Sequence, residues 1–234
     1  MTIETRESVQ DLLAQLHAER VATWAPADLQ VNIDQRRKLV ETADPARFVQ
    51  VGSVVEPFSL REVDGGEVTL DGVLADGPAV LIFFRFAGCP ACNIALPYYE
   101  RRLQPELKRL GARLVAVSPQ VPELLVEIKR RHGLTFDVAS DAGNALGRRF
   151  GITFESDEAS RKAAVAKGRT LGEVTGTGTW ELPMPTAIVI GHDRVVRFVD
   201  VAPDWLARME AEPIIAEVSA LRADVDSERV YEKA

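Results

Sequence analysis

Residues 79–97 have the sequence AVLIFFRFAGCPACNIALP, in which a short apolar run leads directly into a pair of cysteines. The run from Ala79 to Phe84 is continuous rather than alternating, which is typical of a strand buried on both faces of a sheet. From about residue 90 to 110 the apolar positions recur at helical spacing. The sequence therefore predicts a buried strand, then Cys89 and Cys92, then a helix.

Strand and helix patterns alternate on both sides of this stretch. Upstream, residues 58–63 and 67–70 flank Asp64-Gly65-Gly66, which predicts a β-hairpin because glycine supplies the positive φ angles of such turns. Downstream, the pattern predicts strands over 113–117, 135–139, 186–190 and 195–199. It predicts helices over 121–132, 141–150, 159–166 and 212–222. Residues 171–179 are rich in Gly and Thr and are interpreted as a loop. This order favours an α/β fold with a central mixed sheet flanked by helices.

Two amphipathic helices are predicted ahead of this core, over residues 4–23 and 26–40. Their other faces mix both charge signs, so packing on the core or on a second subunit of a homodimer is favoured over membrane attachment. The expected division is an N-terminal helical extension over 1–50, the main domain over 51–222 and a polar C-terminal tail over 223–234.

Composition excludes several classes of protein. The 234 residues are 46% hydrophobic and 27% charged, as in a globular protein with a sizeable core. The net charge of −7 argues against nucleic acid and anionic membranes as partners. The sequence shows neither the apolar segment of a signal peptide nor one long enough to span a membrane, so we expect a cytoplasmic protein.

The chain has two cysteines, three positions apart, which in a reducing compartment indicates redox or metal chemistry rather than a structural disulfide. Two cysteines cannot complete a structural zinc site, and none of His17, His132 and His192 belongs to a spaced motif that would supply the missing ligands. No metal and no organic cofactor are expected.

The position of Cys89 favours a reactive thiolate. At a helix N-terminus, unpaired backbone N–H groups and the helix dipole stabilise negative charge, and the thiolate is the attacking form. Cys89 is therefore expected to be the more exposed and more acidic thiol and the nucleophile, with a pKa below about 8.5, and Cys92, one turn further on, the buried resolving partner. The alternative is that both cysteines merely fill space as small hydrophobic residues.

Several motifs resemble a known family. The run from Phe83 to Pro97 is similar to the active-site segment of thioredoxin-fold proteins, and Met184-Pro185-Thr186 resembles the cis-proline segment that faces the cysteines in that fold. Further segments resemble the peroxiredoxin-like branch of the AhpC/TSA family nearly end to end: Phe58-Ser-Leu60, Val117-Ser-Pro-Gln120, Ser140-Asp-Ala-Gly-Asn144, Trp180-Glu-Leu-Pro183 and Val201-Ala-Pro-Asp204. The resemblance implies a thioredoxin-like fold and a cis Met184–Pro185 bond close to the cysteines.

The chain also departs from that family. Its peroxidases carry proline seven and threonine three residues before the reactive cysteine, where this chain has Ile82 and Phe86, and Pro185 replaces a later arginine. Since such donors stabilise the transition state electrostatically, their loss predicts slow peroxide reduction. Arg85 remains as a nearby cation, which either stabilises a thiolate or oxyanion or pairs with a surface carboxylate.

Three further residues lie in or next to these motifs. Trp180 precedes the Pro185 segment and is either a wall of the site or, as is more common, part of the core. Asp204 and Trp205 are expected to be structural.

The leading interpretation is a thiol-disulfide oxidoreductase. Cys89 attacks a hydroperoxide or disulfide, Cys92 displaces the product to form the Cys89–Cys92 disulfide, and a cytosolic dithiol reductant of the thioredoxin type restores the dithiol. One alternative is a thioredoxin-like protein disulfide reductase without peroxidase activity. Another is a redox-gated binding protein that turns over no substrate.

Overall fold

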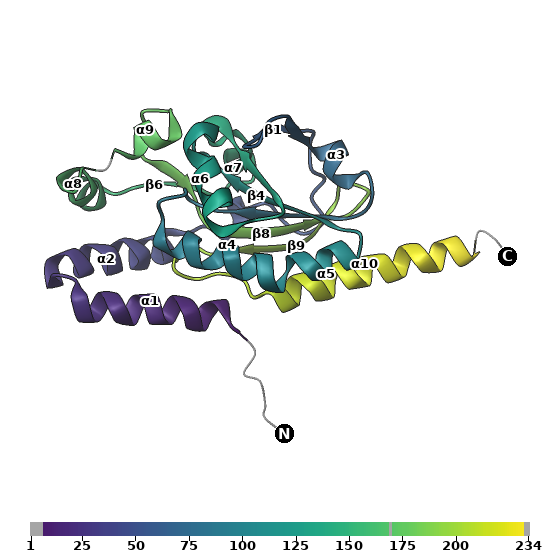
Figure 1. Cartoon of the computed structure of the whole chain (residues 1–234), viewed down its shortest axis with the longest axis horizontal. Helices are drawn as coiled ribbons and strands as arrows, with labels where there is room; N and C mark the ends of the chain where they lie inside the picture. Colours follow the sequence, from purple (N-terminus) through teal and green to yellow (C-terminus); the bar gives the residue numbers. More distant parts are fainter. Residues whose placement is uncertain (1–6, 169, 232–234) are drawn as a thin grey trace, which may run out of the picture.

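A seven-stranded sheet forms the centre of the computed structural model, which describes residues 7–168 and 170–231 (Figure 1). The strand order is β2-β1-β5-β4-β3-β8-β9; β3, β4 and β5 run parallel and the other neighbours are antiparallel, so the sheet is mixed, as predicted. Its strands are β1 (Ser59–Glu62), β2 (Glu67–Thr69), β3 (Ala79–Phe83), β4 (Arg113–Ser118), β5 (Asp137–Ser140), β8 (Thr186–Ile190) and β9 (Val196–Val201).

Helices cover both faces of this sheet. Strand β3 is buried along its whole length, with Val80 and Ile82 in one apolar core and Leu81 and Phe83 in the other. The first core is closed by α4 (Pro90–Arg102), α5 (Gln104–Arg109), α6 (Pro122–His132) and α10 (Ala211–Tyr231), and the second by α3 (Leu70–Leu74) and α7 (Ala145–Arg149). The continuous apolar run of β3 thus places the residues that follow it at the edge of a sheet with two covered faces.

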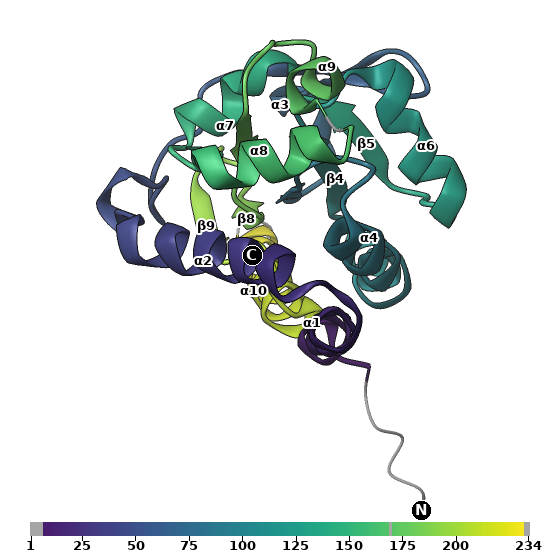
Figure 2. The same cartoon turned by 90° about the vertical axis from the view of Figure 1, so that its left-hand side faces the viewer.

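The N-terminal helices α1 (Val9–Thr23) and α2 (Pro26–Thr42) lie side by side at one end of the molecule (Figures 1 and 2). Val9 and Leu13 of α1 are buried in the core that also contains α4. Packing of the N-terminal helices on the core is therefore confirmed; the part of the predicted first helix over residues 4–6 lies outside the described residues.

Several parts of the chain differ from the sequence prediction. The helix predicted over 90–110 is two helices, because Pro105 near the start of α5 cannot donate its backbone N–H to a continuing helix. The predicted 171–179 loop contains a short helix, α9 (Leu171–Thr175), which ends at Gly176 with φ of 68°. The predicted helix over 141–150 begins as a 3-10 turn, and the last helix continues beyond residue 222 to Tyr231.

A second, two-stranded sheet was not predicted. It pairs β6 (Thr153–Glu155) with β7 (Glu181–Pro183), and α8 (Glu158–Ala166) lies in the segment between them, next to α2 (Figure 2). Strands of three residues are too short to show a period of two. Within the described ranges, no helix is both long and apolar enough to cross a membrane.

Candidate active site

Cys89 stands at the junction between strand and helix that the sequence predicted. It is the N-cap residue of α4, Pro90 occupies the first helical position, and the Cys89 carbonyl accepts the N–H of Asn93 at 3.1 Å. Proline suits this position because its missing N–H would have no partner inside the helix. The first N–H groups of α4 therefore lie around Cys89, where they favour negative charge.

The turn between β3 and Cys89 is held by the neighbouring strand and helix. The buried Gln120 side chain accepts the N–H of Ala87 at 2.6 Å, and the Ser118 hydroxyl donates to the Arg85 carbonyl at 3.0 Å. From α4, the Asn93 amide donates to the carbonyls of Ala87 and Cys89 at 2.7 and 2.9 Å. These bonds explain the Val117-Ser-Pro-Gln120 motif: it positions the backbone that leads into Cys89.

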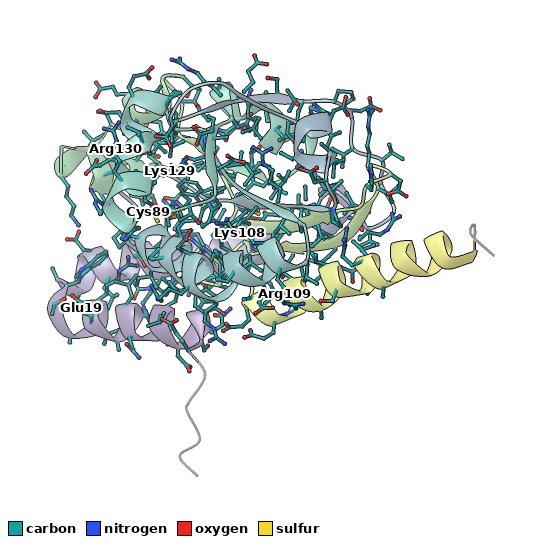
Figure 3. All side chains as sticks on the ribbon, turned by 45° about the vertical axis from the view of Figure 1, so that its right-hand side comes forward. Glu19, Cys89, Lys108, Arg109, Lys129 and Arg130 are labelled. Carbon is teal, nitrogen blue, oxygen red and sulfur yellow. The ribbon has the colours of Figure 1, made fainter. Side chains whose placement is uncertain are left out.

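Both cysteines are buried thiols. Cys89 is 1% exposed and Cys92 0%, and both belong to the core that contains Met184 and Trp205. Cys89 was expected to be the more exposed of the two thiols, but the difference is only 1%, because residues distant in the sequence pack over the start of α4. Figure 3 shows Cys89 within the packed part of the molecule, with Glu19 on the pale purple helix α1.

The pKa values of the two thiols are shifted in opposite directions. A hydrogen bond from the Cys92 thiol holds the pKa of Cys89 well below its usual range despite burial, with further help from the charges of Arg85 and Arg208. Burial raises the pKa of Cys92 well above its usual range, and the adjacent Cys89 adds to this effect. The pKa of Cys89 is therefore the lower of the two, as predicted. The largest contribution to its lowering comes from the Cys92 thiol.

This hydrogen bond gives a first testable prediction. Cys92→Ala removes the donor, and a hydrogen bond to a charged group is worth about 1.5–3 kcal/mol, so the pKa of Cys89 should rise by about one to two units. Cys92→Ser keeps an O–H donor and should retain a low pKa. Thiolate absorbance near 240 nm against pH measures both; equal pKa values in the two variants would show that Cys92 does not stabilise the thiolate.

Arg208 is a site residue that sequence analysis missed. It is 5% exposed, its Nη2 lies 3.7 Å from the Cys92 sulfur, and its Nη1 donates to the carbonyls of Trp205 and Ala207. The one sequence signal was its position four residues beyond Asp204, at the end of a motif that resembled the family. Its guanidinium lies against the Cys92 sulfur, and its charge also lowers the pKa of Cys89.

Trp205 forms the centre of the arginine-rich side of the site. The Arg85 guanidinium lies 4.6 Å from the centre of the Trp205 ring, and the indole N–H donates to the buried Gln35 side chain at 3.1 Å. Arg85 therefore stacks on an aromatic ring, and no salt bridge joins it to a carboxylate among the described residues. Trp205 was expected to be only structural; the structure places it next to the cation on the active-site turn.

Two further arginines reach this ring from the N-terminal helices. Arg20 of α1 and Arg36 of α2 lie 5.6 and 5.8 Å from the Trp205 ring centre, and Arg36 pairs with Asp204 at 3.2 Å. Arg20 could have been noticed in the sequence, because it falls on the same helical face as the buried Val9 and Leu13. An arginine on the apolar face of a helix indicates that its side chain is buried.

Pro185 lies at the sheet edge that carries the site. It is buried and precedes β8, whose Thr186 pairs with Phe83 at the end of β3. The described peptide bonds are all trans, so the predicted cis Met184–Pro185 bond is wrong. Trans is the favoured form even before proline, by about 0.5–1 kcal/mol, and Ala202 N–H donates to the Pro185 carbonyl at 2.8 Å in this conformation.

The other sequence candidates line the surroundings of the site. Trp180 is partly buried and packs against the core that holds the cysteines, so its core interpretation is favoured. A cavity of about 710 Å³ lies between α2 and the β6–α8 segment; it contains neither cysteine and adjoins the site through Gln35 and Met184. In the part of the chain that is described, no group of three or more His, Cys, Asp and Glu side chains is placed to hold a metal ion.

Comparison with known proteins gives consistent matches. The chain matches the model of the AhpC/TSA family over residues 51–199. It is 28% identical to peroxiredoxin Bcp of Escherichia coli (strain K12) over 105 residues, or 44% of this chain and 65% of that protein. It is 28% identical to the chloroplastic peroxiredoxin Q of Oryza sativa subsp. japonica over 104 residues, or 44% of this chain and 47% of that protein. The chain thus spans about half the length of these peroxiredoxin Q relatives.

Solved structures support the fold assignment. The peroxidoxin BcpB of Mycobacterium tuberculosis superimposes with a TM-score of 0.58 at 22% identity, covering 74% of this chain and 97% of that one. A peroxiredoxin-like protein from Aquifex aeolicus gives a TM-score of 0.56 at 16% identity, covering 74% and 88%. The predicted thioredoxin-like fold is confirmed by this likeness and by the mixed sheet.

Proposed function

The chain belongs to the AhpC/TSA family, and from this membership we propose that it is a thiol-dependent peroxidase that cycles through the Cys89–Cys92 disulfide. The observation that carries the proposal is the position of the buried cysteine pair at the N-terminus of α4, with Cys89 as the N-cap and Cys92 inside the first turn; the opposite shifts of the two cysteine pKa values agree with it. A thiolate next to a protonated thiol is the arrangement that two-step thiol chemistry needs, since one sulfur attacks and the other then resolves.

The steps follow from the positions of the two sulfur atoms. The Cys89 thiolate attacks the terminal peroxide oxygen; an S–O bond forms, the O–O bond breaks, and the departing oxygen takes a proton to leave as water or an alcohol. Cys92 then gives up its proton and attacks the Cys89 sulfur, forming the disulfide as hydroxide leaves and is protonated to water. An external dithiol supplies two electrons and two protons to restore both thiols.

Arg85 and Arg208 are proposed to stabilise negative charge during these steps. Both lower the pKa of Cys89, and Arg208 also lies against Cys92, which must lose its proton in the second step. Guanidinium groups that are already held in place in a buried site need little rearrangement when negative charge develops on the reacting atoms. Pro185 is proposed to form part of the wall at the same sheet edge.

Burial of the cysteines favours a hydroperoxide over a protein disulfide as the oxidant. Attack on a disulfide requires the attacking sulfur to approach a bulky partner in line, and Cys89 is only 1% exposed. A small hydroperoxide meets this restriction more readily. A cytosolic dithiol protein of the thioredoxin type is proposed as the reductant, the cytoplasm as the location, and a homodimer as the assembly.

The test is a turnover assay with a thioredoxin-type regenerating system. Hydrogen peroxide, tert-butyl hydroperoxide and an oxidised protein disulfide are compared as oxidants at equal concentration. We expect consumption of the hydroperoxides and little reduction of the protein disulfide. Turnover of the disulfide alone would replace the proposal by a disulfide reductase, and failure of all three would favour a redox-gated binding protein.

A second prediction concerns the rate of this reaction. Ile82 and Phe86 offer no side-chain hydrogen-bond donor to the peroxide, so the rate constant for oxidation by hydrogen peroxide should stay about a hundredfold or more below the diffusional ceiling of about 10⁸–10⁹ M⁻¹s⁻¹. Stopped-flow tryptophan fluorescence measures it. Phe86→Thr returns a hydroxyl donor and should raise the rate about tenfold or more; a wild-type rate near the ceiling would show that the missing donors do not matter.

A further inference from the structure

Three arginine side chains, Arg20, Arg36 and Arg85, form a cluster around one aromatic ring. The three guanidinium groups lie within 4.6–5.8 Å of the centre of the Trp205 ring. They come from three separate elements, namely α1, α2 and the turn after β3. Arg208 adds a fourth cation beside Cys92. Such a concentration of charge is notable in a chain whose net charge is −7.

Salt bridges within the described residues compensate part of the positive charge of this cluster. Asp204 pairs with Arg36. The Cys89 thiolate and the Glu19 carboxylate interact electrostatically with Arg20. No salt bridge joins Arg20 or Arg85 to a carboxylate in the described part of the chain, whereas Arg36 has one. Burial lowers the pKa of Arg20, and repulsion from Arg36 and Arg85 acts in the same direction.

The Arg20 guanidinium lies 4.9 Å from the centre of the Trp24 ring and 5.6 Å from that of Trp205, but one of its hydrogen-bond donors is unmet within the part of the chain that is described. The Arg20 side chain is 4% exposed, and its Nη1 has no hydrogen-bond partner among the described residues. The Nε atom of Arg85 is likewise buried and without a partner in the described ranges. A buried guanidinium with an unmet donor is costly, and a carboxylate, with two acceptor oxygens, satisfies such donors best.

We propose that Arg20 and Arg85 bind the carboxylate of an anionic oxidising substrate over the Trp205 ring, so that the N-terminal helix pair is part of the substrate site. This inference rests on the proposed function and specifies its substrate class. The substrate is a hydroperoxide, or a small disulfide, that carries a carboxylate. Cys89 attacks its O–O or S–S bond; the carboxylate-bearing alcohol or thiol leaves with a proton, and Cys92 completes the disulfide as described above.

The experiment uses the reduced full-length chain and oxidants that differ mainly in the charge of their end group. Linoleic acid hydroperoxide is compared with its methyl ester, below the concentration at which either forms micelles. The disulfides 3,3′-dithiodipropionate, bis(2-hydroxyethyl) disulfide and cystamine form an anionic, neutral and cationic series. Stopped-flow fluorescence gives the rate constant for each, so the two arms distinguish a hydroperoxide from a disulfide as the source of the carboxylate.

In the wild type we expect the anionic member of at least one series to react about tenfold or more faster than its neutral analogue at low salt. In Arg20→Gln that ratio should fall close to one. The ratio is taken within each variant, so a general change in Cys89 reactivity cancels. Arg37→Gln is the matched control: it removes one positive charge from an exposed position on α2 and should keep the wild-type ratio.

A measurement on the wild type alone guards against a misfolded variant. Octanoate should slow oxidation by hydrogen peroxide, whereas octanol at the same concentration should not. Equal rates for charged and neutral oxidants, together with no protection by octanoate, would overturn the carboxylate site. If hydrogen peroxide still formed a sulfenic acid on Cys89, the proposed function would survive that failure; absence of sulfenic acid with every hydroperoxide would overturn the proposed function itself.

Discussion

Cys89→Ser is expected to abolish reaction with hydroperoxides, whereas Cys92→Ser is expected to stop the cycle after its first step. The difference follows from the structure, in which Cys89 is the N-cap of α4 with a lowered pKa and Cys92 has a raised pKa. A serine hydroxyl at position 89 stays protonated near neutral pH and is a far weaker nucleophile than a thiolate.

The intermediate that accumulates identifies the chemistry. In Cys92→Ser, one equivalent of hydroperoxide should leave a sulfenic acid on Cys89, which dimedone labels and mass spectrometry locates. Because the substituted serine retains a hydroxyl donor, the pKa of Cys89 should stay low and the first step should remain fast. The wild type should instead yield the intramolecular disulfide and little dimedone adduct.

Cys89→Ser serves as the control, since it retains the second thiol. Labelling of Cys92 in Cys89→Ser at a rate similar to that of Cys89 in the wild type would reverse the assignment of the two cysteines. A mixed disulfide with a protein partner in Cys92→Ser, without any sulfenic acid, would instead support a disulfide reductase.

The parts of the site that the sequence predicted are those specified by neighbouring residues. The apolar run of β3, Pro90 at the first position of α4 and the two cysteines are continuous in the chain, so local patterns were sufficient to place Cys89 at a helix N-terminus. The β1–β2 hairpin was predicted for the same reason, as Gly65 and Gly66 adopt φ of 110° and 87°.

The parts that were missed depend on contacts between distant segments. Arg20 and Arg208 lie far from Cys89 in the chain, and an arginine in a sequence does not reveal whether it faces solvent or a buried sulfur. Burial of Cys89 was missed for the same reason, since it depends on the packing of the surrounding core. The trans Met184–Pro185 bond corrects a feature that was taken from resemblance and had no local physical cause.

Glu210→Gln is expected to loosen the N-terminal helix α1, which carries Arg20. The Glu210 carboxylate accepts hydrogen bonds from the Ser8 hydroxyl at 2.6 Å, the Tyr98 hydroxyl at 2.7 Å, and the N–H groups of Val9 and Gln10, both at 3.1 Å. It therefore anchors the first turn of α1, where a negative charge is favourable. An amide keeps the shape and loses the charge, which should lower the free energy of unfolding by about 1–2 kcal/mol at pH 7.

The pH dependence of this effect has a definite sign. Burial alone would raise the pKa of Glu210, but its hydrogen bonds hold the pKa below the usual range. A lowered pKa in the folded state means that the stabilisation is fully present above the unfolded value of about 4.3. It is lost as the pH falls through the folded value. The difference in stability between the wild type and Glu210→Gln should therefore be constant near neutral pH and shrink below about pH 4.

Urea unfolding from pH 3 to 7 measures this difference, and Glu217→Gln, the same substitution within α10, which Glu210 directly precedes, is the control. Hydrogen exchange should show the loss of protection in α1 before the central sheet, because the bonds removed join α1 to the start of α10. If Arg20 binds substrate, Glu210→Gln should also reduce the preference for anionic oxidants while leaving Cys89 chemically intact. Unchanged protection of α1 in Glu210→Gln would mean that apolar packing of Val9 and Leu13 suffices to hold this helix, and that the carboxylate is not its anchor.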